Sequence, residues 1–396
     1  MRPPQVTVTA RDVQTLFEAW LAPVLGPWPV VRSCTASTVC ALLAYAAHRL
    51  SSLADACRRL ADAPDSDTVL NRLRAQLDDP VVLDRRLRAA FGGHLPRAVR
   101  RGRWPVALDL TLIPYHGQPF ADPAEVYRSQ PKGGTTHFHA YATAYLVRDG
   151  QRFTLALVAV RKAAPMADVV RELCRRVRAI GVNARVLLMD RGFNNAGVVR
   201  YLQAARYPFI LPQAVHGKLP KDGSLRGLRA IRAGHPTGWT TYTWRPVGQR
   251  RVTVDLCVCR RRRADRKGHR AFLYACGRVR ATPRWVKNTY RARFGIETSY
   301  RQMHRARIRT TTRRPLLRLF FVAVALLLRN LWAWVHWTAL ARRRRGGRRV
   351  RLERLRFATL RLWLAHRTEA AFHYTDQTTA EHPPTDDLAT RPSRRP

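Results

Sequence analysis

The chain has 396 residues, of which 72 are Lys or Arg and 26 are Asp or Glu, so its formal net charge is +46. Such a charge repels itself and needs a polyanionic partner. Nucleic acid is the favoured partner, because basic side chains release phosphate counterions on binding. Only six of the basic residues are lysines, an arginine skew that GC-rich codon use also produces. Seven cysteines without a CxxC pair argue against a structural zinc site. With no signal-like start, they predict a cytoplasmic, nucleoid-associated protein.

Residues 1–100 have the pattern of a helical, basic, DNA-binding N-terminal domain. An amphipathic stretch at 51–60 is followed by a turn-rich segment and a second helix at 68–77. Asn71, Arg72 and Arg74 lie on the polar face of that second helix. The pair at 51–77 is typical of a helix-turn-helix that reads DNA, although an ordinary helical hairpin with a solvated basic face has the same pattern.

Residues 101–212 alternate between strands and helices and predict an α/β unit, the first part of a catalytic core. The expected strands are 105–110, 137–147, 152–160, 184–189 and 207–212, and the expected helices are 166–180 and 194–206. Two hairpin-like strands followed by a crossover give a mixed sheet flanked by helices.

Residues 213–282 are rich in β patterns and predict an insertion, with strands near 240–244, 251–259 and 271–274. Residues 283–341 return to helix and complete the core, with helices at 283–310 and 316–341. The uninterrupted apolar part of the second helix, 319–328, is too short to span a membrane, which takes about 20 residues, so we expect a buried core helix. Residues 342–396 are expected to form a basic run, a helix to about 366 and a disordered tail.

Three acidic residues occupy positions in the sequence that suggest a functional role. Asp109 and Asp190 each end an apolar run that predicts a strand, and Glu297 lies within a basic helix. Carboxylates that converge from separate elements are the ligands of a two-metal site for phosphoryl transfer. A lone acid at a strand end is more commonly a capping or turn residue, but three in these contexts favour a metal site.

The helix around Glu297 presents an unusual face. Three- and four-residue steps place aromatic, cationic and acidic groups on one side: Tyr290, Arg293, Glu297, Tyr300, Arg301 and His304. An ordinary amphipathic helix would bury aliphatic residues there, so this face predicts contact with phosphate. A solvated basic face is the alternative.

The spacing of Tyr290, Arg293, Glu297 and His304 resembles the YREK signature of the DDE transposases of bacterial and archaeal insertion sequences. The segment 109–117 resembles the first-Asp motif of that family, and Asp190-Arg191-Gly192-Phe193 resembles the second. The resemblance covers roughly residues 104–335. His304 stands where the signature has Lys, and since His is mostly neutral at pH 7, Arg301 or Arg305 would replace that charge.

The resemblance implies a ribonuclease-H-like fold and a Mg²⁺-dependent enzyme that uses two ions, with Mn²⁺ as a substitute. Asp109 would bridge both ions, and Asp190 and Glu297 would each complete one. The implied partners are double-stranded DNA, as terminal inverted repeats and target, and a second subunit in a homodimeric synaptic complex. Residues expected to contact DNA are Tyr290, Arg293, Arg301, His304, Arg191, Asn71, Arg72, Arg74 and Trp244. For Trp244, stacking on an extruded base competes with plain core packing.

Two other functions fit the same residues. A catalytically impaired transposase acting as a DNA-binding repressor is suggested by His304, and a junction-cleaving nuclease of the same fold shares the three acids. His137 and His139 alternate on one predicted strand face, where a packed pair is favoured over a metal role.

Overall fold

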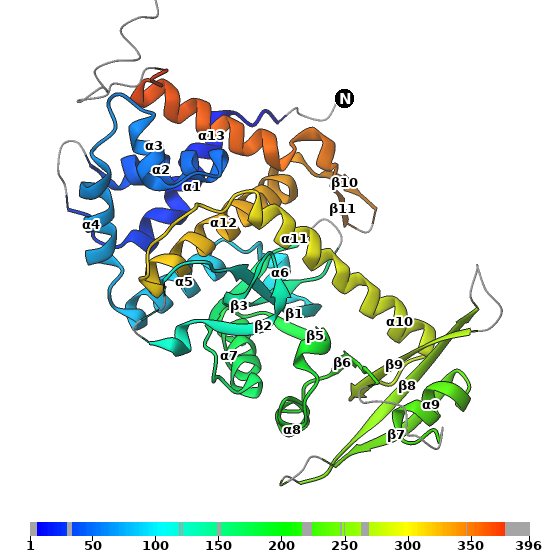
Figure 1. The fold of residues 1–396 in the computed structure, drawn as a ribbon. Coiled ribbons are helices and arrows are strands. Elements are labelled where there is room, and N and C mark those ends of the chain that lie inside the picture. The colour runs from blue at the N-terminus through cyan, green and yellow to red at the C-terminus, as the bar shows by residue number, and fades with distance from the viewer. Residues whose placement is uncertain are drawn as a thin grey trace, which may run out of the picture.

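The computed structural model describes residues 6–29, 34–118, 120, 122–148, 152–215, 224–245, 248, 250–262, 269–345 and 347–376. The predicted disordered tail lies mostly outside these residues. The structure has a helical cluster at one end, a mixed sheet in the middle and a β extension at the other end (Figure 1).

The N-terminal part is helical, as predicted. Its helices are α1 (Ala10–Leu25), α2 (Ala36–Arg49), α3 (Leu53–Arg58), α4 (Ser66–Gln76), α5 (Pro80–Gly93) and α6 (Arg97–Arg101). Thr9 caps α1 through a capping box with Asp12, and Asp65 caps α4 by accepting from the amides of Asp67 and Thr68. Helices α3 and α4 occupy the positions of the predicted helix-turn-helix. Helix α3 is short, and α4 begins directly after its cap residue, Asp65.

In the described part of the chain, nine strands form one mixed sheet in the order β2-β3-β1-β5-β6-β9-β8-β7, with β4 also paired to β3. The strands are β1 (Arg103–Pro114), β2 (Tyr127–Lys132), β3 (Thr135–Leu146), β4 (Thr154–Val160), β5 (Asn183–Met189), β6 (Phe209–Pro212), β7 (Gly238–Trp244), β8 (Val252–Arg262) and β9 (His269–Gly277). Strand β1 pairs parallel with β5 and antiparallel with β3. The predicted fold class, an α/β mixed sheet flanked by helices, is confirmed.

The two faces of the sheet are covered by different helices. Val106 and Leu108 pack in one core with α7 (Met166–Ala179) and α8 (Ala196–Ala204). Ala107 and Ile113 face the other side, where α11 (Gly295–His304) and α12 (Pro315–Val335) cover the sheet. This alternation is the period-two pattern of a strand with both faces buried.

The β-rich block predicted at 213–282 continues the main sheet. Strand β9 pairs antiparallel with β6 over Phe209–Pro212, and β8 and β7 follow outward. The block therefore extends away from the core as an arm, with α9 (Leu228–Gly234) beside it (Figure 1).

The single helix predicted at 283–310 is wrong. The chain forms α10 (Pro283–Arg291), a 3₁₀ turn at Ala292–Phe294 and then α11. Arg293 within the turn still contacts Tyr290 before it and Glu297 after it.

The apolar helix α12 is long and apolar enough to cross a membrane by length and composition, but 83% of its most apolar window is buried inside the protein. It packs in one core with α1, α2 and α13 (Phe357–Phe372). Helix α13 ends at Phe372, later than the predicted end near 366. Its buried Leu360 and Leu364 tie the end of the chain to the N-terminal helices, so the predicted units 1–100, 283–341 and 342–396 share one core.

Candidate active site

Asp109 is positioned by the register of two parallel strands. The last β1–β5 pair is Leu108 with Met189, so Asp109 is the first β1 residue beyond the β5 ladder. Strand β1 itself runs on to Pro114 and pairs Asp109 with Thr143 of β3. The expectation that Asp109 ends its strand is therefore wrong, because β3 continues the pairing after β5 has stopped. Asp109 is buried, with 6% of its surface exposed.

Asp190 directly follows β5 and lies beside Asp109 for that reason. Its Oδ1 accepts from the amide of Gly192 at 2.9 Å and so caps the short turn at Arg191–Phe193. Burial and then the charge of Asp190 raise the pKa of Asp109 to about 7, against the opposing effect of Arg293. Burial also raises the pKa of Asp190, again opposed by Arg293. Two carboxylates forced together in a buried place favour the binding of a cation.

Arg293 connects the third acid to this pair. Its Nη1 donates to Oδ2 of Asp109 at 2.9 Å, and its Nη2 lies 3.7 Å from Oε1 of Glu297. Its Nε donates to the hydroxyl of Tyr290 at 3.2 Å. Tyr290 and Arg293 are buried, whereas the Glu297 side chain is 54% exposed. In this structure the guanidinium is paired with carboxylates, and its predicted contact with a DNA phosphate stays a prediction.

The three acids fit a divalent metal by their chemistry. All offer carboxylate oxygens, the donors that Mg²⁺ and Mn²⁺ prefer, and they come from β1, the end of β5 and α11. Among the described residues, no group of three or more His, Cys, Asp or Glu is gathered closely enough to hold a metal as it stands. The side-chain contacts account for this, because Arg293 supplies the positive charge between Asp109 and Glu297.

The remaining residues of the predicted helix face differ in their surroundings. Tyr300 turns inward, and its hydroxyl lies 2.7 Å from the Thr143 hydroxyl. Arg301 and His304 are exposed on α11. Partial desolvation of the ring, followed by the charges of Arg307 and Lys132, lowers the pKa of His304. A neutral His304 does not supply the positive charge that Lys gives at this place in the signature.

The predicted N-terminal DNA contacts lie on α4. Arg74 donates to the side-chain oxygen of Asn71 at 2.7 Å, and Arg72 donates to the carbonyl of Cys34 at 3.1 Å. Asn71 is exposed, while Arg72 and Arg74 are half-buried. These contacts position the side chains locally, and their role in reading DNA stays a prediction.

The aromatic residues of the β extension are partly packed. Trp244 contacts Tyr242 edge-on with ring centroids 6.1 Å apart, and Trp239 donates to the carbonyl of Ala281 at 3.1 Å. Trp244 and Tyr242 line a shallow hollow beside α9. Trp239 is thus a packing residue, and the stacking role of Trp244 is untested.

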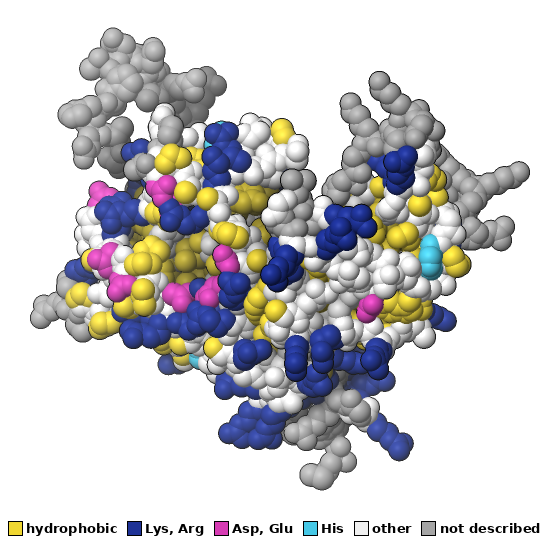
Figure 2. Space-filling model, turned by 90° about the horizontal axis from the view of Figure 1, so that it is seen from below, with side chains coloured by type: hydrophobic (Ala, Val, Ile, Leu, Met, Phe, Trp, Pro, Cys, Tyr) yellow, Lys and Arg dark blue, Asp and Glu magenta, His cyan; other side chains and the backbone are white. Residues whose placement is uncertain are grey.

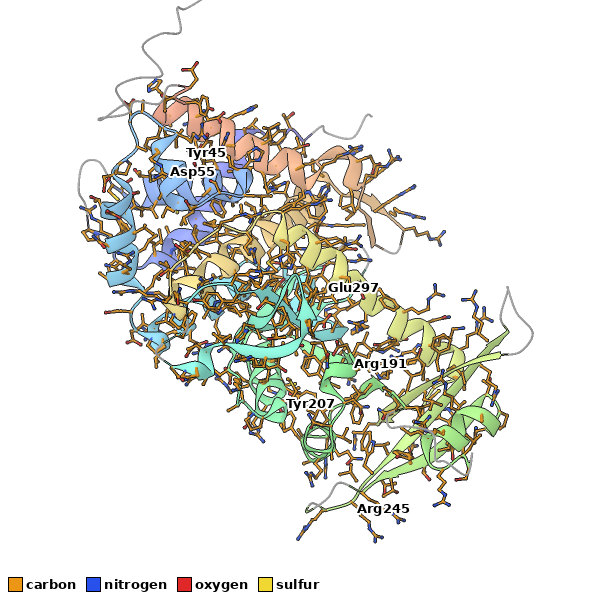
Figure 3. The ribbon with its side chains drawn as sticks, in the orientation of Figure 1. Tyr45, Asp55, Arg191, Tyr207, Arg245 and Glu297 are labelled. Carbon is orange, nitrogen blue, oxygen red and sulfur yellow. The ribbon has the colours of Figure 1, made fainter. Side chains whose placement is uncertain are left out.

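A cavity of about 680 Å³ opens directly beside Asp190 and was missed by the sequence reasoning. It lies between the ends of β6 and β9 and the α10 segment. Basic and aromatic side chains line it: Arg191, Arg232, Arg261, Lys287, Arg291, Arg293, Phe272, Tyr274, Tyr290 and Phe294. Phe294 is 50% exposed, and a large apolar residue at an exposed place within the signature helix was the available signal. Arg191 and Glu297 both lie on the part of the central sheet region that is nearer to the extension formed by β7, β8 and β9 (Figure 3).

Charge is distributed unevenly over the surface. On the face shown in Figure 2, Lys and Arg side chains lie in several separate groups, while most of the Asp and Glu side chains gather on one side. A broad basic surface beside a buried acidic site is suited to a polyanion whose backbone reaches a metal centre.

The mixed sheet of nine described strands, flanked by helices, is consistent with a ribonuclease-H-like fold. The chain belongs to the transposase DDE domain family, whose model matches residues 100–331. It is therefore a DDE transposase, a metal-dependent enzyme that cleaves and joins DNA, and DNA is its partner.

The fold is similar to that of the piggyBac transposase in a synaptic complex with hairpin DNA. The TM-score is 0.54 with 12% sequence identity, and the match covers 94% of this chain and 82% of the other. No curated protein matches the sequence.

Proposed function

We propose that this transposase cleaves the ends of an insertion sequence of the YREK group and transfers them to target DNA with Mg²⁺ as its cofactor. The observation that carries the proposal is the convergence of Asp109, Asp190 and Glu297 around one buried arginine. The family match supports the activity, and the spacing from Tyr290 to His304 supports the group.

Asp109, Asp190 and Glu297 would hold the metal. When bound, two ions would supply Lewis-acid stabilisation of the attacking and leaving oxygens. The protein contributes rigid placement, because Asp109 is held within β1 and Asp190 is held by the Gly192 amide. Arg293 has five N–H donors, more than its contacts to Asp109 and Tyr290 use, so it can also bind a phosphate oxygen near the carboxylates.

The DNA is expected to lie across the basic surface, with terminal inverted repeats as the bound ends. Two ends must meet for transposition, and we propose a homodimer on DNA in a cytoplasmic, nucleoid-associated location. Arg191, Arg301 and Trp244 would contact the bound strands, and α4 would read the repeat through Asn71, Arg72 and Arg74.

The test uses purified full-length protein, Mg²⁺ or Mn²⁺, and labelled DNA ends taken from the sequence that flanks the gene. Wild-type protein should nick these ends, Glu297→Ala should not, and Glu353→Ala, which removes an exposed acid far from the site, should behave as wild type. Equal nicking by Glu297→Ala would contradict the proposed site. Preference for four-way junctions over linear ends would instead indicate a junction nuclease.

A second candidate is a repressor that binds its own ends without cutting them. The observation that favours it is the neutral His304. Binding of the ends without metal-dependent cleavage, unchanged in His304→Lys, would support this function.

A further inference from the structure

A second polar site lies further along the strands that carry the catalytic residues. Asp109 pairs with Thr143 and, four residues on, Ile113 pairs with His139. A four-residue step along a strand is about 13 Å. Asp109 and Ile113 point to the same face of the sheet, because side chains alternate and Ile113 packs with the α11–α12 segment. The site therefore lies under the chain that connects α11 to α12 (Figure 1).

The site is a cavity of about 140 Å³. A single water needs only about 15 Å³ by this kind of measure, so the cavity has room for a larger group. Its polar side chains come from β3, the α11–α12 connection and α12, and they include His139, Tyr141, Arg307 and Arg318. In the part of the chain that the structure describes, no Asp or Glu lines it.

Two of these groups have buried polar atoms without a hydrogen-bond partner among the described residues. They are Nε2 of His139 and Nη1 of Arg307. His139 is only 5% exposed, so its ring nitrogen is cut off from bulk water. Buried polar groups are normally satisfied, and an exception indicates a bound group or an ordered water.

The neighbouring arginine is held in place by the protein. Nε of Arg318 donates to the carbonyl of Thr312 at 2.5 Å, and its guanidinium lies 5.3 Å from the centre of the Tyr115 ring. Tyr115 and Phe120 also pack edge-on against His139. These contacts fix the direction of two donor groups before any ligand binds.

The electrostatic environment agrees with a site for an anion. Burial and then the charges of Arg318 and Arg307 lower the pKa of His139 to about 4. Burial likewise lowers the pKa values of Arg307 and Arg318, and nearby arginines contribute at Arg307. Cationic groups packed together without an acid are unfavourable until an anion joins them.

We propose that this cavity binds a phosphate group, with the Arg307 and Arg318 guanidinium groups and the His139 ring as donors. Guanidinium forks match phosphate oxygens, and a neutral histidine has one N–H to add. In the DNA complex this is a backbone phosphate. The step of about 13 Å along the strands places it within a few nucleotides of the cleaved bond. Only this assignment to DNA rests on the proposed function.

The first test needs neither DNA nor activity. The Tm of full-length wild type is measured in EDTA with increasing inorganic phosphate, against chloride at matched ionic strength. Phosphate should raise the Tm by roughly 1–3 °C once it exceeds its Kd about fivefold. Arg307→Gln and Arg318→Gln should each lose this rise. Arg313→Gln, which removes an exposed charge from the same connection, should keep it, as should Glu297→Ala.

The second test identifies the source of the phosphate. Duplex ends are made with one neutral methylphosphonate at successive positions, and binding is measured by anisotropy. Wild type should lose about tenfold in affinity at one position within a few nucleotides of the cleavage site, and Arg307→Gln should show no such position. A phosphate-dependent Tm without a sensitive position would indicate a site for a free phosphate.

An equal Tm in phosphate and chloride for the wild type would overturn the proposal and leave ordered water as the occupant. A phosphate effect that persists in both arginine variants would overturn it as well. Neither outcome depends on whether the protein nicks DNA, so the phosphate site and the proposed function can fail separately.

Discussion

Two places on the same strands of this transposase have opposite chemistry. Around Asp109 the strands and α11 bring three acids together with one buried arginine between them. Four residues further along β1, a cavity is lined by three arginines and a histidine and by no described acid. The comparison shows that one face of a rigid sheet can carry a group of carboxylates and a group of basic side chains at a fixed separation. A DNA backbone that binds the basic side chains through one phosphate would then present another phosphate to the carboxylates.

The largest expected effect comes from removing a carboxylate of the acidic place. Asp109→Ala should reduce the rate of end cleavage at least about 1000-fold, because the metal supplies several kcal/mol of transition-state stabilisation. Single-turnover cleavage of labelled ends in Mg²⁺ checks this. Asp55→Ala, which removes an acid of α3 in the helical cluster, is the control and should retain activity. A loss of less than tenfold would mean that Asp109 is no ligand.

The next largest effect tests whether the charge of Arg293 stabilises the buried carboxylate of Asp109 in the folded protein. Arg293→Gln should destabilise the protein by about 3–5 kcal/mol, because it leaves buried Asp109 without its partner. Adding Asp109→Asn should restore much of that loss, since the pair is then removed together. Urea unfolding in EDTA measures both variants. Arg301→Gln, an exposed arginine on α11, should change stability by less than about 0.5 kcal/mol. If the single and double variants are equally unstable, the pairing contributes little.

In the cavity lined by basic side chains, His139 makes the free energy of unfolding depend on pH. Its pKa in the folded protein is about 4, below the ordinary value of 6.5. The unfolded chain therefore takes up the proton first, and stability is lost as the pH falls from 6.5 towards 4. Between pH 7 and 4, wild type should lose up to about 3 kcal/mol more than His139→Gln. Asp109, with its pKa raised to about 7, contributes with the opposite sign but cancels between the two proteins. Parallel pH curves would show that His139 is not held neutral.

The smallest effect concerns repulsion within the cationic place. Arg307→Met keeps the apolar stem of the side chain and removes its charge from beside Arg318. In phosphate-free buffer this variant should be as stable as wild type or more stable by about 1 kcal/mol. Urea unfolding in chloride checks it, with Arg313→Met as the matched control near zero. A loss above about 1 kcal/mol would show that Arg307 is satisfied by the protein itself.

The sequence was informative wherever a pattern is local. Apolar runs marked β1, β3, β4, β5, α7 and α8, because strand and helix periodicity depend on nearby residues. The three acids could be selected from 26 because each stood at the end of an apolar run or within the signature helix. The predicted continuous helix at 283–310 failed because the turn at Ala292–Phe294 contains no Pro to signal it, and its buried residue is the charged Arg293.

The sequence by itself determined the fold class and the basic character of the protein, and it selected the three acids that we propose as catalytic. Only the tertiary structure decided that Asp109 stands beside Asp190, because that contact depends on where β5 stops pairing with β1. It also decided that Arg293 lies between the carboxylates and that Arg307 and Arg318 meet His139 across about 170 residues of chain. Contacts between distant segments follow from strand register and helix packing, and no local pattern of residues carries that information.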